Sequence, residues 1–173
     1  VVDSVLPDGV INVITGFGQS AGEPIVNHPD VPVVTFTGSV ATGKKIAKFA
    51  AENLKKVSLE RGGKDPMIIC DDADIEIAAQ GASWGGFVNA GQVCTSIERV
   101  YVFENVMDQF TEAIIEEAKK VVLGDPMKED THIGPMASKL QQEKAIKKVN
   151  QAIKDGARPV SYTHLTLPTN SNV

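Results

Sequence analysis

The sequence predicts an α/β fold in which a largely parallel sheet is built from repeated strand, turn and helix units. Short runs rich in Val, Ile and other apolar residues alternate along the chain with longer segments whose apolar residues recur at helical spacing. Turns that contain glycine separate the two kinds of segment. Strands that alternate with helices favour parallel pairing, because each helix carries the chain back to the start of the next strand.

The first part of the chain contains two such units. Residues 10–15 are rich in β-branched residues and predict a short strand, followed by a short helix over residues 21–26. Residues 31–36 form a second apolar run, which we expect to be a buried parallel strand.

A helix is expected directly after this second strand. Ser39 is placed to cap it, because a serine oxygen accepts a hydrogen bond from a backbone N–H of the first turn. Ile46, Phe49, Ala50 and Leu54 then recur at helical spacing, with lysines between them. This spacing predicts a helix that extends to about Leu54.

The next unit repeats this order with strands expected over residues 57–60 and 66–70. Residues 71–74 place carboxylates at the start of a helix, where the helix dipole favours negative charge. The helix itself, residues 75–88, is rich in Ala and Gly. Other segments can therefore approach its backbone closely, and we expect it to be deeply buried.

The last units contain a strand over residues 99–103 and an amphipathic helix over 107–121. A final helix is expected over residues 138–155, with Gly156 as its stop. Its predicted inward residues are Ile146, Val149 and Ile153.

Composition excludes several classes of function. The 173 residues carry a formal net charge of -5 with a pI near 5.2, which argues against nucleic-acid or membrane-surface partners. The sequence shows neither a long apolar run nor a signal-peptide pattern, which favours a cytoplasmic location. With only Cys70 and Cys94, a disulfide is not expected, and Cys70 fits a buried structural cysteine.

Both ends suggest an internal piece of a longer protein. The sequence opens at Val1 without an initiator methionine, inside what already looks like structured sequence. Residues 160–173 contain no Asp, Glu, Lys or Arg and resemble the translation of a sequencing-library adapter. We therefore expect them to be a non-native tail; the alternative is a natural strand over residues 162–167.

Three glycine-rich patterns compete as a phosphate site. Gly16, Gly18 and Gly22 are too widely spaced for the dinucleotide fingerprint. Residues 38–44 resemble a P-loop, but Lys45 replaces the Ser or Thr that would hold magnesium. The third pattern is a strand followed by glycine and serine at a helix N-terminus. Free N–H groups there can bind a pyrophosphate, but the same pattern is equally typical of a plain capped helix.

Cys94 and Glu60 are the candidate chemical groups. Cys94 follows the small-residue helix where regular structure ends, but a buried structural cysteine is the commoner fate of a free thiol. Glu60 ends a strand ahead of two glycines, where a surface ion pair is the commoner role. Both alternatives stay open from the residues alone. The histidines, His28, His132 and His164, lie apart in sequence and predict neither a triad nor a metal site.

The order and spacing of five segments are more specific than any one of them. The segments are Phe36–Ser39 with Gly43, Leu59–Pro66, Asn89–Cys94, Gly124–Pro126 and Gly134–Pro135. Together they closely resemble the aldehyde dehydrogenase superfamily. The resemblance covers residues 1–159 and implies part of a modified Rossmann cofactor domain over residues 1–59, followed by the start of an α/β catalytic domain over 60–159.

The resemblance also implies the site residues. The cofactor, NAD or NADP, would lie against a set of small residues: Gly18, Gly22, Gly38, Ser39, Thr42 and Gly43. Cys94 matches the family's nucleophile and Glu60 its general base, while Arg61 stands where many members have leucine. No metal is implied.

The implied reaction is oxidation of a small aldehyde to a carboxylic acid through a cysteine thiohemiacetal and a thioester. The longer parent is expected to be a homo-oligomer, dimer or tetramer, and the piece alone is expected to be inactive. Residues 96–102 resemble members that act on succinate semialdehyde or other small aliphatic aldehydes. The alternatives are a CoA-acylating semialdehyde dehydrogenase, against which Glu60 argues, and an inert structural fragment.

Overall fold

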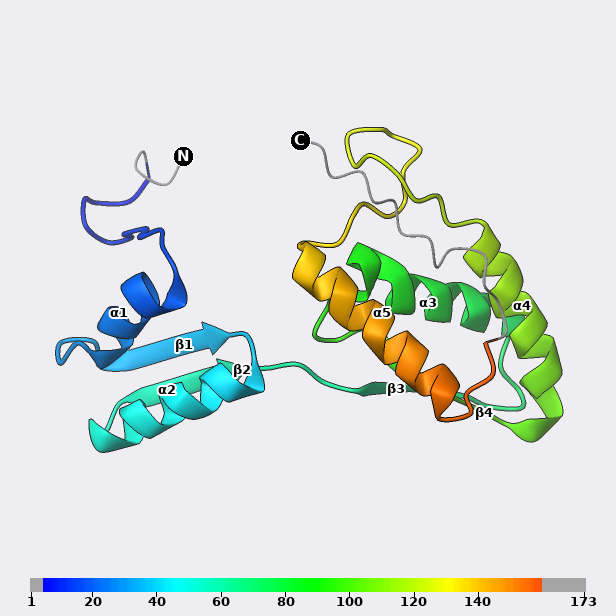
Figure 1. The fold of residues 1–173 in the computed structure, drawn as a ribbon, viewed down its shortest axis with the longest axis horizontal. Helices are drawn as coiled ribbons and strands as arrows, with labels where there is room; N and C mark the ends of the chain where they lie inside the picture. Colours follow the sequence, from blue (N-terminus) through cyan, green and yellow to red (C-terminus); the bar gives the residue numbers. More distant parts are fainter. Residues whose placement is uncertain (1–4, 160–173) are drawn as a thin grey trace. The chain divides into compact units, whose positions relative to one another are not determined.

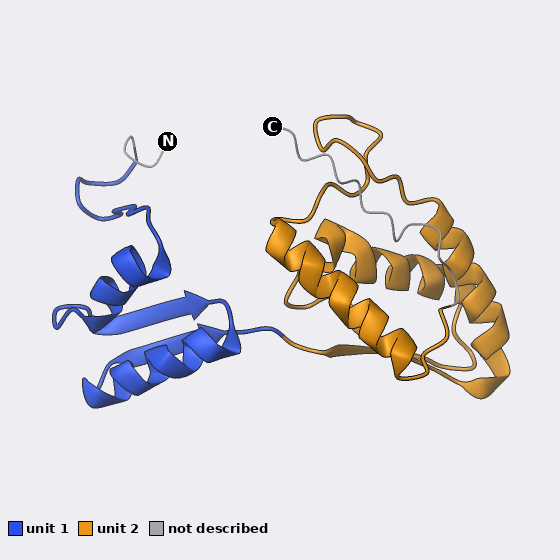
Figure 2. Cartoon of the chain, in the orientation of Figure 1, with its two compact units in different colours: residues 1–62 blue, residues 63–173 orange. Residues whose placement is uncertain are grey.

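The computed structural model describes residues 5–159. The chain divides into two compact units, residues 1–62 and residues 63–173 (Figure 2). Each unit contains one pair of parallel strands together with helices, as the α/β prediction requires. The predicted tail over residues 160–173, and the alternative strand within it, lie outside the described residues.

Unit 1 is built around the strand pair β1 (Val33–Thr37) and β2 (Lys56–Glu60), which are joined by helix α2 (Val40–Glu52) (Figure 1). A π-helical turn (Gly18–Gly22) and the short helix α1 (Glu23–Asn27) precede them. The predicted order of short helix, strand, capped helix and strand is confirmed.

The core of unit 1 is small. Ala50 and Ile46 from α2 are 1% and 7% exposed, and Val34 from β1 is 8% exposed. The prediction that β1 is a buried parallel strand holds for one face only, since Val34 is buried while Val33 is 55% exposed. Leu54 is also misplaced by the prediction, because α2 ends before it and its side chain is 94% exposed. The apolar residues keep their helical spacing in the sequence beyond Glu52, where α2 ends.

The predicted strand over residues 10–15 is wrong. These residues form no strand, and nothing within residues 5–159 pairs with them. Val13 is 85% exposed, and the nearby Phe17 is 86% exposed. A strand is defined by hydrogen bonds to a neighbour, so an apolar β-branched run alone does not produce one.

Unit 2 contains β3 (Asp65–Ile69), α3 (Ile75–Phe87), β4 (Ile97–Val102), α4 (Met107–Lys119) and α5 (Lys139–Lys154). Two short 3₁₀ turns lie between them, Val88–Gly91 and Glu104–Val106. β3 and β4 pair in parallel with an irregularity between Asp65 and Pro66. Every element expected in this part of the chain is present, within a few residues of its predicted bounds.

The core of unit 2 lies where α3 and α4 pack together beside β3. Its buried members are Ile69, Ile75, Ala79, Ala82, Val106 and Phe110. Asp74 caps α3, its side chain accepting a hydrogen bond from the Ile77 N–H at 3.1 Å. The prediction that α3 is deeply buried holds for one face only, because Ile77 and Trp84 are 67% and 73% exposed.

Helix α5 begins and ends as predicted. Ser138 caps its first turn, and Gly156 follows it with a φ of +98°, which favours glycine. The predicted inward face is wrong: α5 has no buried residue, and Ile146 and Val149 are 40% and 37% exposed. An amphipathic pattern predicts a helix, but it does not supply the surface that the helix packs against.

Phe110 is the largest side chain of the unit 2 core, at 5% exposed. Phe110→Ala is expected to lower the free energy of unfolding of unit 2 by about 3–5 kcal/mol, because it removes buried apolar surface and leaves a cavity. Urea unfolding followed by circular dichroism measures the loss. Phe103→Ala is the matched control, since Phe103 is 50% exposed and its truncation should cost less than about half as much.

Within residues 5–159, none of the helices is both long enough and apolar enough to cross a membrane.

Candidate active site

Cys94 lies in the irregular segment between the end of α3 and the start of β4. Its side chain is exposed and its thiol is free. Cys70 is also exposed and free, so its predicted burial as a structural cysteine is wrong. Strand β3 ends at Ile69, which puts Cys70 outside the core, in the turn before α3.

The turn that leads to Cys94 has a disfavoured backbone. Asn89, Ala90 and Gly91 have φ values of 53°, 57° and 71°, all in the left-handed region. Glycine and asparagine tolerate this region, but an alanine there costs about 1–2 kcal/mol because its Cβ crowds the following carbonyl. Backbone strain of this kind persists where surrounding contacts hold it, and it concentrates at functional sites.

Hydrogen bonds from Asn89 and Gln92 hold the turn. Asn89 Nδ2 donates to the Gln92 carbonyl at 3.2 Å, and Gln92 Nε2 donates to the Asn89 carbonyl at 3.0 Å. The Oε1 of Gln92 accepts a third hydrogen bond from the backbone N–H of Ala137, also at 3.0 Å. Sequence reasoning did not single out Gln92, because its partner Ala137 lies 45 residues away along the chain.

Close packing fixes the chain around Cys94. A Cβ on Gly63 would lie 3.2 Å from the Cys94 carbonyl oxygen and 2.9 Å from the Asp65 carboxylate. A glycine at position 63 therefore allows the nucleophile segment to approach the start of β3. Directly after Cys94, Ser96 is 4% exposed, and the side chain of Ile97 occupies the space that a Cβ on Gly85 would need.

Exposed charged side chains also link the segment before β3 to the start of β4. Lys64 Nζ lies 2.8 Å from Glu98 Oε2, and Arg99 Nε donates to the Lys64 carbonyl at 2.8 Å. The Arg99 guanidinium also lies over the Tyr101 ring, 5.8 Å from its centroid. The Lys64 side chain is 66% exposed, so the ion pair contributes little stability by itself. Together with the Arg99 hydrogen bond, it links the start of β4 to the segment before β3.

Glu60 belongs to unit 1 and is the last residue of β2. It is exposed and stands opposite Thr37, the last residue of β1. Its carbonyl accepts a hydrogen bond from the Gly38 N–H at 3.0 Å. The candidate base and the first residue of the predicted phosphate site are therefore joined at the carboxyl edge of this strand pair.

The N-terminus of α2 brings together four of the six predicted cofactor residues. Ser39 Oγ accepts from the Thr42 N–H at 3.2 Å and lies 2.9 Å from Thr42 Oγ1. Gly38 precedes this cap, and Gly43 is buried beside the Arg61 side chain. First-turn N–H groups and the dipole of a 13-residue helix suit an anion, so these residues fit the pyrophosphate part of a dinucleotide.

Gly18 and Gly22 lie elsewhere in unit 1, in the π-helical turn before α1. A Cβ on either would have nothing within 4 Å. No hydrogen bond within the described residues joins them to Ser39 or Thr42, and their predicted contact with the cofactor stays a prediction.

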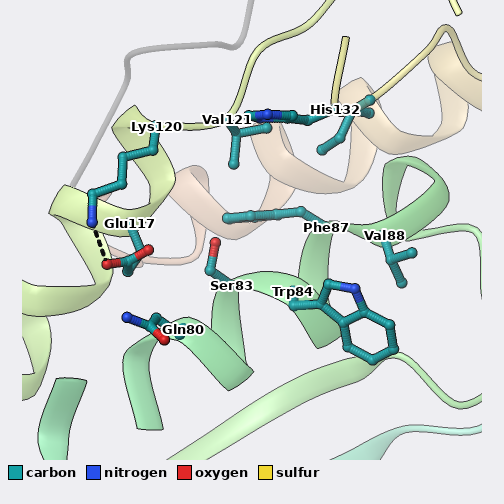
Figure 3. A pocket seen from close by; sticks show the side chains of 10 residues that line it. Gln80, Ser83, Trp84, Phe87, Val88, Glu117, Lys120, Val121 and His132 are labelled. Carbon is teal, nitrogen blue, oxygen red and sulfur yellow. Dashed lines mark hydrogen bonds and ion pairs between the residues drawn. The ribbon is translucent and has the colours of Figure 1, made fainter. Parts of the chain in front are cut away.

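A pocket of about 410 Å³ lies in unit 2, between α3, the end of α4 and the segment that follows (Figure 3). It is lined by Gln80, Ser83, Trp84, Phe87, Val88, Glu117, Lys120, Val121, His132 and Ile133. At its edge Lys120 donates to Glu117 at 2.6 Å, and this hydrogen bond raises the pKa of the lysine amine. Cys94 does not line the pocket, which is therefore separate from the candidate nucleophile.

No group of three or more His, Cys, Asp or Glu side chains within residues 5–159 is arranged to hold a metal ion.

Comparison with known proteins decides the family. A sequence profile described as "Aldehyde dehydrogenase family" matches residues 1–171. The chain belongs to the aldehyde dehydrogenase family. The resemblance seen in the sequence and the aldehyde dehydrogenase-like α/β fold are thereby confirmed.

Relatives from bacteria and plants support this membership. The chain is 47% identical to a betaine aldehyde dehydrogenase of Sinorhizobium fredii over 160 residues, 92% of this chain and 33% of the relative. It is 44% identical to a chloroplastic aminoaldehyde dehydrogenase of Arabidopsis thaliana over 152 residues, 88% of this chain and 30% of the relative. The chain thus spans about a third of the length of these relatives.

Solved structures of the family have the same fold. A Bacillus cereus aldehyde dehydrogenase, determined as its NAD+ complex, aligns with a TM-score of 0.88 at 43% identity, covering 91% of this chain and 32% of that one. A Pseudomonas syringae aldehyde dehydrogenase variant, complexed with NAD+ and octanal, aligns with a TM-score of 0.87 at 34% identity, covering 92% and 33%.

Proposed function

We propose that this chain carries the nucleophile, the general base and part of the cofactor site of an NAD-dependent enzyme that oxidises an aldehyde to a carboxylic acid. The observation that carries the proposal is the exposed thiol of Cys94, which follows a strained turn and lies in a closely packed segment, in a member of the aldehyde dehydrogenase family. An inert cysteine needs no such arrangement.

The chemistry begins at Cys94. Its thiolate attacks the carbonyl carbon of the aldehyde, forming a carbon–sulfur bond and an oxyanion that the Cys94 backbone N–H can stabilise. The carbonyl then re-forms as the C–H bond of this adduct breaks, and a bound dinucleotide would accept the hydrogen as hydride. The product left on the enzyme is a thioester at Cys94.

Glu60 acts in the second step. Its carboxylate removes a proton from a water molecule, the oxygen of which attacks the thioester carbon. The carbon–sulfur bond breaks, the carboxylic acid leaves, and Cys94 is regenerated. A base of this kind separates the hydrolytic reaction from CoA acylation, in which a thiol replaces water.

NAD is the proposed cofactor, and the support comes from two sources. Structures of relatives from B. cereus and P. syringae were determined with NAD+. In this chain the capped N-terminus of α2 offers the N–H groups that a pyrophosphate requires. We further propose that unit 1 contributes to cofactor binding and unit 2 supplies the thiol chemistry.

The proposed substrate is a small aldehyde that carries an amino or quaternary ammonium group. Similar proteins bear the names betaine aldehyde dehydrogenase and aminoaldehyde dehydrogenase, which favours this class over succinate semialdehyde. The homo-oligomeric state expected for the longer protein stays a prediction.

The activity is testable in a hybrid enzyme, in which residues 5–159 of this chain replace the matching segment of the S. fredii betaine aldehyde dehydrogenase. The hybrid is expected to form one NADH and one carboxylic acid for each betaine aldehyde consumed. Absorbance at the NADH band and chromatography of the acid measure both. A folded hybrid that binds NAD but forms no NADH with aldehyde contradicts the proposal, and formation of acyl-CoA with added CoA identifies the alternative reaction.

Ser39 provides a second test, which separates a phosphate contact from a plain helix cap. Ser39→Ala and Ser138→Ala each remove a cap oxygen that accepts from an N–H three residues later, at 3.2 Å and 3.3 Å. Both are expected to cost about 1 kcal/mol of stability. Only Ser39→Ala is expected to weaken NAD binding, measured by calorimetry on the hybrid. Equal NAD affinity in the two variants would show that Ser39 is only a cap.

A further inference from the structure

We propose that Gln92 is a positioning residue, which orients Cys94 by joining the strained turn before it to the segment that precedes α5. The inference rests on the proposed role of Cys94 as nucleophile. Gln92 lies two residues before Cys94 and is half-buried.

The turn before Cys94 needs contacts that hold it in place. Asn89, Ala90 and Gly91 are consecutive residues in the left-handed region, with Ala90 carrying a side chain that disfavours it. Left without support, this stretch would relax to other backbone conformations. Cys94 would then move, because only Val93 lies between it and Gln92.

Gln92 forms hydrogen bonds across this turn. Its backbone N–H and its Nε2 both donate to the Asn89 carbonyl, at 3.1 Å and 3.0 Å. Asn89 Nδ2 donates back to the Gln92 carbonyl at 3.2 Å. The two residues therefore form a closed set of hydrogen bonds around the left-handed stretch, which offsets its conformational cost.

The oxygen of the same amide binds a segment that is distant in sequence. Gln92 Oε1 accepts a hydrogen bond from the Ala137 N–H at 3.0 Å. Ala137 directly precedes Ser138, the residue that caps α5. One side chain thus donates to the turn and accepts from the segment before α5. An ionised glutamate side chain has acceptor oxygens but no donor, and methionine has no donor and only a weak sulfur acceptor.

The consequence is a fixed position for the thiol. Nucleophilic attack needs the sulfur at a defined distance and angle from the carbonyl carbon, and a displacement of about 1 Å can reduce the rate about 100-fold. Supporting hydrogen bonds of this kind set the geometry of reacting groups without touching the substrate.

The hydrogen bonds are tested on the 173-residue chain itself by amide hydrogen exchange. Gln92→Met is expected to speed exchange at Ala137 roughly fivefold, because the N–H loses its acceptor. Gln92→Glu keeps an acceptor oxygen and is expected to restore protection at Ala137, while exchange within residues 89–92 stays faster than in the wild type. Unchanged exchange at Ala137 in Gln92→Met overturns the proposal.

The role in positioning is tested in the hybrid enzyme. Gln92→Met is expected to lower kcat about 10- to 100-fold while the KM for NAD stays within about twofold. Gln151→Met is the matched control: it removes a hydrogen bond from α5 to Asp155, the residue that follows the helix, and kcat should not change. If Gln92→Met keeps wild-type kcat while Cys94→Ala is inactive, the inference fails and the proposed function stands. If the unmodified hybrid is inactive, the proposed function fails, while the exchange measurement still tests the Gln92 bridge.

Discussion

Cys94→Ala is expected to lower aldehyde-dependent NADH formation by the hybrid enzyme about 10⁴-fold or more. Alanine has no group that can bond to the carbonyl carbon, so neither the thiohemiacetal nor the thioester can form. The side chain of Cys94 is exposed, so its truncation leaves no buried cavity and the hybrid should stay folded. Initial rates measured by NADH absorbance, with NAD affinity measured in parallel, test this expectation.

Cys70 offers a matched control for this experiment. It is the other cysteine of the chain, and it is also exposed and free. It lies in the turn between β3 and α3 and takes no part in the hydrogen bonds and close contacts that hold the Cys94 segment. Cys70→Ala should therefore retain the wild-type rate. A Cys94→Ala hybrid that still turns over removes Cys94 from the mechanism, whatever the outcome at Cys70.

Glu60→Gln is expected to separate the two halves of the reaction. The amide cannot accept a proton from water, so hydrolysis of the thioester should slow by about 10²- to 10⁴-fold. Hydride transfer precedes this step, so each active site should still release close to one NADH in a rapid burst. Mass spectrometry of the quenched enzyme should then find an acyl group on the peptide that contains Cys94.

The control for this experiment is Glu52→Gln. Glu52 is an exposed glutamate at the end of α2, so the substitution makes the same change of charge away from the strand end. It should leave both the burst and the steady rate unchanged. Steady turnover at the wild-type rate in Glu60→Gln, with no acyl adduct, would assign the hydrolytic base to another residue.

Local features of the fold were predictable from sequence. Ser39, Asp74 and Ser138 each accept from the N–H three residues later, so their capping depends on neighbouring residues alone. Burial was less predictable, because it depends on partners far away in sequence. Leu54 had the right spacing for an inward face, and Cys70 had apolar neighbours, yet both are exposed.

The candidate site was predictable only in part, for a similar reason. The order and spacing of the surrounding segments predict Cys94 and Glu60 as nucleophile and base, and these two roles stay predictions. The left-handed conformation of Ala90 has no signal in sequence, since alanine normally avoids it. The bridge from Gln92 to Ala137 depends on the folded chain bringing together residues that lie 45 positions apart.

Trp84 gives unit 2 an optical reporter of its own. It is the one tryptophan in the sequence, it lies on the exposed face of α3, and 73% of its surface is in contact with solvent. An indole in water emits at longer wavelength than an indole that is covered by apolar groups. Anything that covers this face of α3 will therefore shift the fluorescence of the chain to shorter wavelength, without any label being attached.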